Sequence, residues 1–318
     1  MKILHLITTI SIGGAERQLL LVSSEQTQRG NQVYVAYLKD SPDLAREFSL
    51  KGITVFHHLA GKPILKQVKL LRRLISDKNF DIIHLHLPRA EVVGAVASFP
   101  KRYFISRHNT ETFIPNRLKF IGRILSLVIS RRAILVIAIS KAVKRFMIEE
   151  KELSAAHKIR VIHYGIEGSI RRRNEETKVV SKTPLEYGTL SRLVPQKNLD
   201  CMIKAFFSSN VMHSGHKLKI AGSGYLESDL RELARGLDCD KSVSFVGKVI
   251  AEPFLDSLDC FVLSSRYEVS NVLQLSSLFK RSVNPIFREE LRNEGRRIVS
   301  DFSLEKSIDL LDDAYRVR

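Results

Sequence analysis

Two cations stand five residues apart in one loop of the sequence, between a strand pattern and a helix pattern. Arg192 and Lys197 follow the apolar run that ends at Leu190, and Asn198 precedes the amphipathic run that begins at Leu199. The first turn of a helix presents unpaired backbone N–H groups, which attract anions. An Arg that binds two oxygens and a Lys that acts as a point charge suit a diphosphate better than a carboxylate. A solvated basic loop is the alternative.

Glycine-containing loops could bring the backbone close to the same anion. Gly14 lies in SIGGAER, and Gly222 and Gly224 lie in AGSGY; each segment joins a strand pattern to a helix pattern. Glycine lets the backbone approach a bound group closely, although a plain tight turn is the alternative for the first loop. Neither segment is the full G-x-G-x-x-G dinucleotide fingerprint.

Histidines and paired carboxylates were the other candidates for chemistry. His84 and His86 alternate on one face of a predicted strand and could share a metal ion, but no third ligand is evident, so we expect no metal. His108 ends another predicted strand, where open α/β sheets bind ligands; a structural histidine is the alternative. Asp238 and Asp240 form a D-x-D at a predicted helix end rather than a strand end, and we attribute that pair to chance.

The elements that must position these residues alternate between strand and helix patterns. Seven strand patterns separated by helix patterns precede residue 167, and four more follow residue 183, which predicts an α/β protein of two Rossmann-like domains. From Ser276 to Phe287 we find no strand pattern. The expected parts are residues 1–167 as the first domain, 168–183 as a charged linker, 184–300 as the second domain, and 301–318 as a helix packing back on the first domain.

Charge and composition limit the partners and the compartment. The 318-residue chain has a formal net charge of +17, and residues 51–160 carry +15 of it. A field of that sign attracts nucleic acid or an anionic membrane face. Three widely spaced cysteines form no disulfide or zinc framework, which favours a reducing compartment. The N-terminus lacks a signal-peptide pattern, and the longest apolar run, Ala133 to Ile139, is too short to span a bilayer.

The helix pattern over residues 117–132 has two possible roles. At 100° per residue the apolar side chains, including Ile121, Ile124 and Val128, share one face, and Ser126 and Ser130 share the other. A core-packing helix with a solvated basic face is one interpretation. In the second, the basic side chains form a cationic surface for anionic lipid headgroups. The candidates for facing a membrane are Lys119, Arg123, Arg131 and Arg132.

Several of these segments together resemble GT-B-fold retaining glycosyltransferases of the family 4 type (glycosyl transferases group 1). The motifs are G-G-x-E-R from Gly13, G-x-x-x-R-L-x-x-x-K-N from Gly188, and S-x-x-E from Ser265 to Glu268. The resemblance covers about residues 1–275 and 288–318 and implies two Rossmann-like domains facing each other across a cleft. It also implies an internal deletion that truncates the second domain: Ser276 stands where the second Glu of E-x7-E is expected, and the following strand and Gly-rich loop are missing.

The activity that this resemblance implies is transfer of a sugar from an NDP-sugar to a hydroxyl acceptor, with retention and without a metal or other cofactor. It implies Glu268 and His108 as catalytic residues in contact with the sugar. The implied donor-binding residues are Gly14, Arg192, Lys197, Asn198, Gly222, Gly224, Lys248 and Glu268.

The expected pathway is cell-envelope or surface polysaccharide assembly, with a lipid-linked or glycan acceptor. The protein would then be cytoplasmic and peripherally bound to the anionic inner face of the cell membrane. Two other classes remain open: a non-catalytic glycosyltransferase-like subunit with an incomplete donor site, and a basic nucleic-acid-binding protein. The sequence holds no recognisable nucleic-acid recognition module, so we expect no nucleic-acid partner.

Overall fold

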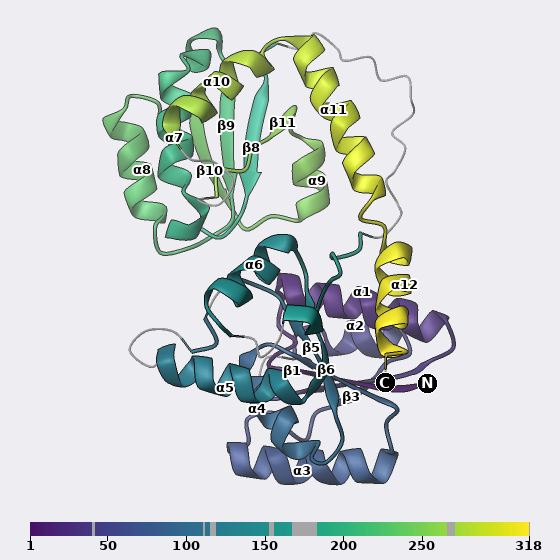
Figure 1. Ribbon diagram of the computed structural model, residues 1–318. Helices are drawn as coiled ribbons and strands as arrows, with labels where there is room; N and C mark the ends of the chain where they lie inside the picture. The colour runs from purple at the N-terminus through teal and green to yellow at the C-terminus, as the bar shows by residue number, and fades with distance from the viewer. Residues whose placement is uncertain are drawn as a thin grey trace. The chain divides into compact units, whose positions relative to one another are not determined.

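The computed structural model describes residues 1–39, 42–110, 112–114, 119–152, 156–166, 183–265 and 271–317. The chain separates into two compact units, one made of residues 1–170 with 298–318 and the other of residues 171–297 (Figure 1). Each unit is built on its own parallel sheet, so the candidate functional groups are carried by two separate scaffolds.

The first unit has a seven-stranded parallel sheet in the order β3-β2-β1-β4-β5-β6-β7. The order reverses at β1 and β4, and parallel α/β sheets bind ligands beyond the carboxyl ends of the strands at such a switch point. The strands are β1 (Lys2–Ile7), β2 (Gln32–Tyr37), β3 (Thr54–Phe56), β4 (Ile82–His86), β5 (Tyr103–Arg107), β6 (Ala133–Ala138) and β7 (Ile159–Val161).

Helices cover both faces of this sheet (Figure 1). On one face α3, α4 and α5 share a core with Leu4, Leu6 and Leu85. On the other face α1 and α12 cover a second core that contains Ile3 and Phe104. The helices of the unit are α1 (Gly14–Gln28), α2 (Ala45–Leu50), α3 (Ile64–Lys78), α4 (Pro88–Ala97), α5 (Lys119–Arg132), α6 (Lys141–Glu149) and α12 (Leu304–Tyr315).

The second unit has a four-stranded parallel sheet in the order β10-β9-β8-β11. Its core lies between this sheet and the helices α7, α8 and α10, with the Tyr187 ring meeting Phe206 and Phe279 edge-on. The elements are β8 (Glu186–Leu190), α7 (Leu199–Ser208), β9 (Lys217–Ala221), α8 (Glu227–Gly236), β10 (Val243–Gly247), α9 (Ala251–Asp256), β11 (Cys260–Phe261), α10 (Val272–Ser282) and α11 (Pro285–Ser300).

Helix α12 follows the second unit in sequence but packs on the first. Arg29, the residue that follows α1, donates to Asp309 and Asp312 of α12, with nitrogen–oxygen distances of 2.6 and 3.1 Å. The ring of Tyr315 is buried against Phe104 of β5. The first unit is therefore assembled from two segments that are far apart in the sequence.

The strand patterns were predicted correctly in type, and one helix was missed. Each strand expected from the sequence has an observed counterpart, because parallel strands buried on both faces are continuous apolar runs. The stretch from Ser276 to Phe287, in which we found no strand pattern, forms the second half of α10 and the start of α11. Helix α10 escaped prediction because its core-facing positions include small polar residues, Ser276 and Ser282, beside Leu275 and Phe279.

Helix α5 faces the core with a side that is rotated from the predicted one. Ile129 is buried and Leu125 packs against the core, as the core-packing interpretation predicts. The same interpretation was wrong for Ile121, Ile124 and Val128, which are 54%, 46% and 57% exposed, and for Ser126 and Ser130, which are buried. Of the proposed basic residues, Arg131 is exposed and Arg123 is half-buried; the side chain of Lys119 lies outside the described part of the chain.

The rotation has a physical cause on the sheet beneath α5. Arg107 is buried there between Glu91 (3.0 Å) and Glu152 (3.2 Å), and its guanidinium also donates to the Ser126 hydroxyl at 2.7 Å. That hydroxyl in turn donates to the backbone oxygen of Glu152. A buried charge cluster must be met by hydrogen-bonding groups, so α5 is rotated to bring Ser126 onto Arg107.

Candidate active site

The donor-side candidates of the second unit lie on loops that follow neighbouring strands. After β8, β9 and β10 the three loops are joined by backbone hydrogen bonds. Ser191 N–H donates to Ala221 O at 3.0 Å, Leu193 N–H to Ser223 O at 3.0 Å, and Gly222 N–H to Gly247 O at 2.7 Å. The carboxyl end of this sheet therefore carries one connected backbone platform, at the edge where α/β sheets bind ligands.

Gly222 and Gly224 are required by the packing of this platform. Gly222 has φ +124°, and a Cβ there would lie 1.8 Å from Ser191 O. A Cβ at Gly224 would lie 2.2 Å from Leu193 O. Both glycines therefore let the loop after β9 press against the loop after β8, which carries Arg192.

The polar candidates occupy different positions on the platform. Arg192 and Lys248 are exposed, and Lys197 is half-buried. Among the described residues neither Arg192 nor Lys197 uses its side-chain cation in a hydrogen bond or ion pair. The backbone oxygen of Lys197 accepts a hydrogen bond from Ser264 at 2.9 Å, which ties this loop to the segment after β11.

Asn198 stands at the N-cap of α7, as expected, but its side chain makes no capping hydrogen bond. Its backbone is left-handed (φ 53°, ψ 41°), a conformation that Asn tolerates better than most residues. Asn198 therefore shapes the turn between the 3₁₀ segment Pro195–Lys197 and α7, and the α7 amides are left uncapped by this side chain.

Two positions of the E-x7-E comparison differ in what the structure describes. Glu268 lies outside the described residues. Ser276 is buried in α10, on the side that packs on the second-unit core together with Leu275 and Phe279. A carboxylate at position 276 would thus be held in an apolar core, so this position serves packing in the present chain.

Gly14, the candidate of the first unit, is the first residue of α1 and follows the end of β1. A Cβ added there would meet nothing within 4 Å. Unlike Gly222 and Gly224, this glycine is not required by contacts with other described residues, which leaves room beside the first turn of α1.

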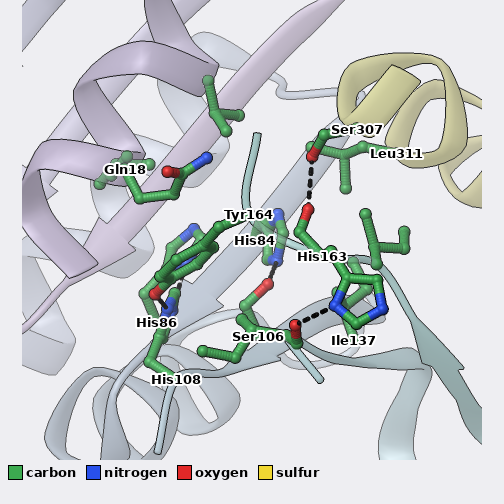
Figure 2. A pocket seen from close by; sticks show the side chains of 14 residues that line it. Gln18, His84, His86, Ser106, His108, Ile137, His163, Tyr164, Ser307 and Leu311 are labelled. Atoms are coloured by element: carbon green, nitrogen blue, oxygen red, sulfur yellow. Dashed lines mark hydrogen bonds between the residues drawn. The ribbon is translucent and has the colours of Figure 1, made fainter. Parts of the chain in front are cut away.

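His108 lies beyond the end of β5 in a chain of hydrogen-bonded rings on the face covered by α1 and α12 (Figure 2). His108 Nε2 meets His86 Nδ1 at 3.1 Å, and His86 Nε2 meets His5 Nδ1 at 3.0 Å. His108 Nδ1 is hydrogen-bonded to the Tyr164 hydroxyl, and His5 Nε2 to the Gln26 side-chain oxygen at 2.8 Å. Both ring nitrogens of His108 therefore have protein partners.

A small cavity adjoins this chain. It measures about 40 Å³, enough for a few water molecules. His86, His108 and Tyr164 line it from the sheet side, Gln18 from α1, and Ser307 from α12 (Figure 2).

Burial keeps these histidines uncharged. It lowers the pKa of His5 to about 4, against the opposing effect of the Gln26 hydrogen bond, and that of His108 to about 4, with a smaller contribution from Arg107. Burial also lowers the pKa of His84 and of His86, and the neighbouring histidines add to the effect. At neutral pH each ring thus has one donor and one acceptor nitrogen.

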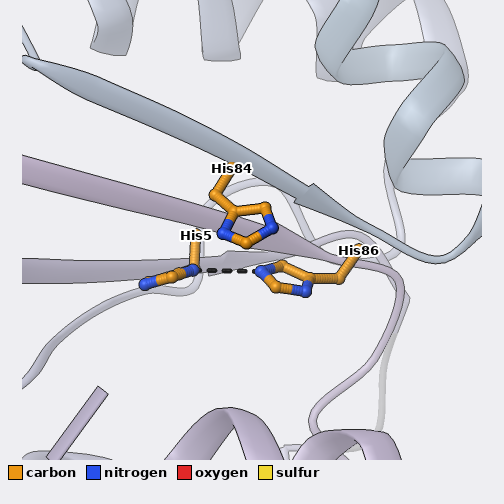
Figure 3. A group of neighbouring side chains, drawn as sticks. All are labelled: His5, His84 and His86. Carbon is orange, nitrogen blue, oxygen red and sulfur yellow. Dashed lines mark hydrogen bonds between the residues drawn. The ribbon is translucent and has the colours of Figure 1, made fainter. Parts of the chain in front are cut away.

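The third metal ligand that the sequence did not reveal is His5. Nitrogens of His5, His84 and His86 lie within 4.8 Å of one another, close enough to share an ion (Figure 3). Both nitrogens of each ring are already engaged, however, those of His84 by Tyr315 (2.7 Å) and Ser106 (2.8 Å). The three ligands would also supply no negative charge in a fully buried site. The observed hydrogen bonds account for the cluster without a metal ion, and that none binds there stays a prediction.

Sequence reasoning found His84, His86 and His108 but missed His5, Gln26 and Tyr164. The available signal was His5 itself, a lone polar residue inside the apolar run of β1. Its parity puts it on the same sheet face as His84, its register partner on β4. Gln26 and Tyr164 belong to α1 and to the segment after β7, and only the packing brings them to this face.

Two Rossmann-like units with parallel sheets, and a cation-bearing loop after the first strand of the second unit, define an α/β protein of the GT-B type. The chain belongs to the glycosyltransferases: the profile of Glycosyltransferase Family 4 matches residues 12–168, and that of Glycosyl transferases group 1 matches residues 185–278. The chain accordingly carries both domains of a sugar-transferring enzyme.

Several individual proteins resemble this chain in sequence or structure, although only a minority of their residues are identical to it. An uncharacterized glycosyltransferase of Haemophilus influenzae is 22% identical over 271 residues, spanning 81% of this chain and 72% of that protein. The structure of Anabaena Alr3699/HepE in complex with UDP-glucose has a TM-score of 0.80 at 18% identity, covering 98% of each chain. A glycosyltransferase from Rickettsia africae has a TM-score of 0.78 at 17% identity, covering 99% of this chain and 97% of that one. These two structures establish the fold.

Proposed function

We propose that the protein transfers a glycosyl group from a nucleoside-diphosphate sugar to a hydroxyl acceptor, with retention of configuration and without a metal or other cofactor. The observation that carries this proposal is the platform of the second unit. Hydrogen bonds and close-packed glycines hold the backbone of this platform. The loop after β8 carries Arg192 and Lys197, whose side chains make no hydrogen bond or ion pair with the described residues. Similarity to a protein whose structure contains UDP-glucose supports a nucleotide sugar as the donor.

Each proposed role follows from the chemistry of the side chain. Departure of the nucleoside diphosphate develops negative charge, which Arg192, Lys197 and the uncapped first turn of α7 would stabilise in place of a metal ion. Gly14 would leave room for a phosphate or the acceptor beside α1. Glu268 would bind hydroxyls of the donor sugar, because a carboxylate accepts several hydrogen bonds. Lys248, Gly222 and Gly224 complete the donor side.

His108 would contact the transferred sugar through Nδ1. That nitrogen is hydrogen-bonded to the Tyr164 hydroxyl in the structure, and a sugar hydroxyl would take the place of the phenol hydroxyl. An uncharged imidazole accepts a hydroxyl proton in a hydrogen bond without adding charge near the reacting centre.

The acceptor proposed here is lipid-linked or a glycan, used in cell-envelope or surface polysaccharide assembly at the cytoplasmic face of an anionic membrane. Helix α5 supports this: Phe120, Ile121, Ile124 and Val128 are exposed on it, and Arg131 is exposed at its end. Exposed apolar side chains beside cations suit a lipid surface better than nucleic acid. No helix within the described residues has the length and apolarity to cross a bilayer.

Of the four basic residues proposed to face the membrane, Arg132 has other partners. Its guanidinium stacks on the Phe99 ring at 4.8 Å and donates to the backbone oxygens of Ala95 and Lys101, each at 3.3 Å. We therefore assign the lipid contact to Arg131, Arg123 and the apolar stripe between them, with Lys119 at the start of the helix.

A non-catalytic donor-binding subunit is the second candidate, favoured by one observation. Ser276 is buried in the core of the second unit, so the hydroxyl-binding carboxylate expected there is missing from the donor site. Such a protein would bind the diphosphate but would neither transfer nor hydrolyse the sugar.

Titration with UDP, GDP and ADP at two salt concentrations, followed by a transfer assay with the donor that binds, tests both candidates. We expect the diphosphate to dominate binding, so the affinity should depend steeply on salt. The affinity should also be about tenfold to a hundredfold lower than that of a site that keeps the nucleoside contacts missing here. Transfer with retention and in the presence of a chelator supports the enzyme. Binding without transfer or hydrolysis supports the subunit, and absence of binding to any diphosphate refutes both.

A further inference from the structure

Three side chains connect His108 to the interior of the first unit by consecutive hydrogen bonds, and Tyr164 bonds to its other side. The sequence of contacts runs from Tyr164 to His108, His86, His5 and finally Gln26. His5, His86 and Gln26 are fully or almost fully buried. His5 and His86 come from β1 and β4, and Gln26 comes from α1, so three elements must be in place to complete the chain.

The buried end of the chain determines the direction of every hydrogen bond. The Gln26 side-chain oxygen faces His5 Nε2, while the buried amide nitrogen of Gln26 has no hydrogen-bond partner among the described residues. In this orientation of the amide the oxygen accepts, so His5 carries its proton on Nε2. His5 Nδ1 must then accept from His86 Nε2–H, and His86 Nδ1 must accept from His108 Nε2–H. His108 Nδ1 is left as an acceptor, which the Tyr164 hydroxyl fills.

We propose that Gln26, His5 and His86 are positioning residues for His108, which hold its ring in the Nε2–H tautomer and present Nδ1 as an acceptor for a hydroxyl of the donor sugar. This inference rests on the proposed sugar transfer. The Tyr164 hydroxyl occupies the place of that sugar hydroxyl and has the same chemistry, an O–H that donates to an imidazole nitrogen. A neutral imidazole without such partners exchanges its two tautomers, so the chain supplies the selection.

His84 provides a matched comparison within the same cluster. It is as buried as His86 and lies two residues before it on β4, but its nitrogens bond to Tyr315 and Ser106 and not to the chain. Loss of a His84 partner disturbs buried polar packing to a similar extent without interrupting the path from Gln26 to His108.

Nitrogen NMR of the full chain labelled with ¹⁵N-histidine tests the assignment directly. The two-bond proton–nitrogen pattern of each ring distinguishes Nε2–H from Nδ1–H. We expect Nε2–H at His5, His86 and His108 in the unmodified protein at neutral pH. An Nδ1–H or charged His108 would overturn the proposal, and this measurement requires no variant to fold.

The substitution Gln26→Leu removes the fixed acceptor while keeping a side chain of similar size. We expect His108 in this variant to show a mixture of both tautomers. The control Ser106→Ala also removes a buried polar side chain, but the hydrogen bond that is lost belongs to His84. We expect His108 to stay in the Nε2–H tautomer in this variant. The same His108 pattern in both variants, whether changed or unchanged, would mean that Gln26 has no particular role in positioning.

Binding measurements separate this inference from the proposed function. Gln26→Leu should weaken binding of the nucleotide sugar by about five- to tenfold and leave binding of the free nucleoside diphosphate unchanged, because only the sugar is proposed to contact His108. Equal weakening of both ligands would contradict a positioning role. If neither ligand binds the unmodified protein, the proposed function fails, whereas the tautomers in the NMR spectrum still decide the hydrogen-bond directions.

The variant Tyr164→Phe tests the place of the phenol hydroxyl. Without that hydroxyl, His108 Nδ1 has no competing donor, and we expect the nucleotide sugar to bind several-fold more tightly, with no change for the free diphosphate. Weaker binding of the sugar nucleotide would show that the Tyr164 hydroxyl itself contacts the ligand, and would overturn its assignment as the group that the sugar displaces.

Discussion

Single residues on the second-unit platform divide into those that shape the backbone and those that present charge. Gly222 and Gly224 were predicted to lie under a nucleotide, and the structure gives them a reason independent of any ligand, the close approach of two loops. Arg192 sits on the loop that they support. Loss of a glycine and loss of a cation should therefore have different consequences, one on folding and the other on binding.

The cations are expected to act on the diphosphate alone. Arg192→Ala and Lys197→Ala should each weaken UDP binding by about tenfold or more, because a hydrogen bond to a charged group contributes roughly 1.5–3 kcal/mol, while uridine binding stays nearly constant. Isothermal titration of both ligands measures this. Lys204→Ala, which removes an exposed cation of α7 already paired with Asp200, is the control. Parallel losses for UDP and uridine would assign these residues to the fold instead.

Gly222 is expected to affect the stability of the fold more than ligand binding. In Gly222→Ala the new Cβ would lie 1.8 Å from Ser191 O at a φ of +124°, so we expect a loss of roughly 2–5 kcal/mol in the free energy of unfolding. Urea unfolding of the second unit measures it. Gly236→Ala at the end of α8, where a Cβ would meet nothing within 4 Å, should change stability little. Similar stability of both variants would mean that the two loops separate easily.

Among the elements, α5 shows where periodicity succeeds and where it misleads. The 3.6-residue pattern correctly predicted a helix with one apolar and one polar side. It did not predict which side faces the core, because that depends on the buried Arg107, Glu91 and Glu152 beneath it, which come from three separate segments. The strands were predicted well for the opposite reason: each buried strand carries its own apolar signal.

The outward apolar side of α5 should be needed for membrane retention. The double substitution Ile124→Gln and Val128→Gln should reduce retention on vesicles containing anionic lipid by roughly tenfold or more, since both side chains would otherwise be buried in the interface. Flotation at low and high salt measures this. Leu50→Gln, which changes an exposed apolar side chain of α2, should leave retention unchanged. Retention that responds to salt but not to the α5 substitutions would argue for a purely electrostatic contact elsewhere.

At the scale of the whole molecule, the buried titratable groups link stability to pH in two opposite directions. The pKa values of His5 and His108 are lowered to about 4, so unfolding at acid pH takes up protons that the folded rings exclude. Burial raises the pKa of Glu91 to about 7, against the attraction of Arg107 and with the repulsion of Glu152. The folded state therefore holds a proton on Glu91 that the unfolded state releases above its ordinary value of 4.5.

The histidines should dominate, because four of them shift in the same direction. We expect the stability of the first unit to be fully present above pH 6.5 and to fall as the pH drops toward 4. Glu91 opposes this loss, since its contribution grows as the pH falls from 7 to 4.5. Urea unfolding of wild type and Glu91→Gln between pH 7.5 and 5 should give a steeper acid loss in the variant. A stability of the Glu91→Gln variant that is independent of pH in this range would show that the rings are hydrated.

The sequence allowed the class of fold, the family and the loop positions of the donor side to be predicted, because each is encoded in contiguous residues. The hydrogen-bonded chain of His5, His86 and His108 could not be predicted from the sequence. Gln26 of α1 and Tyr164 beyond β7 complete this chain, and no local sequence pattern shows that these distant segments meet. For Glu268 the assignment to the sugar remains a prediction.

Helix α12 is synthesised last, although it packs on the first unit, and this order affects folding. The ribosome completes the sheet of the first unit, then the entire second unit, and only afterwards α12. Throughout that interval Ile3, His84 and Phe104 lack the cover that Leu311 and Tyr315 later supply. Domains generally fold as they emerge, the N-terminal one first, so the nascent first unit waits with an open apolar and histidine-lined face. A stalled or prematurely terminated chain would expose that face, which makes it the natural binding place for a chaperone.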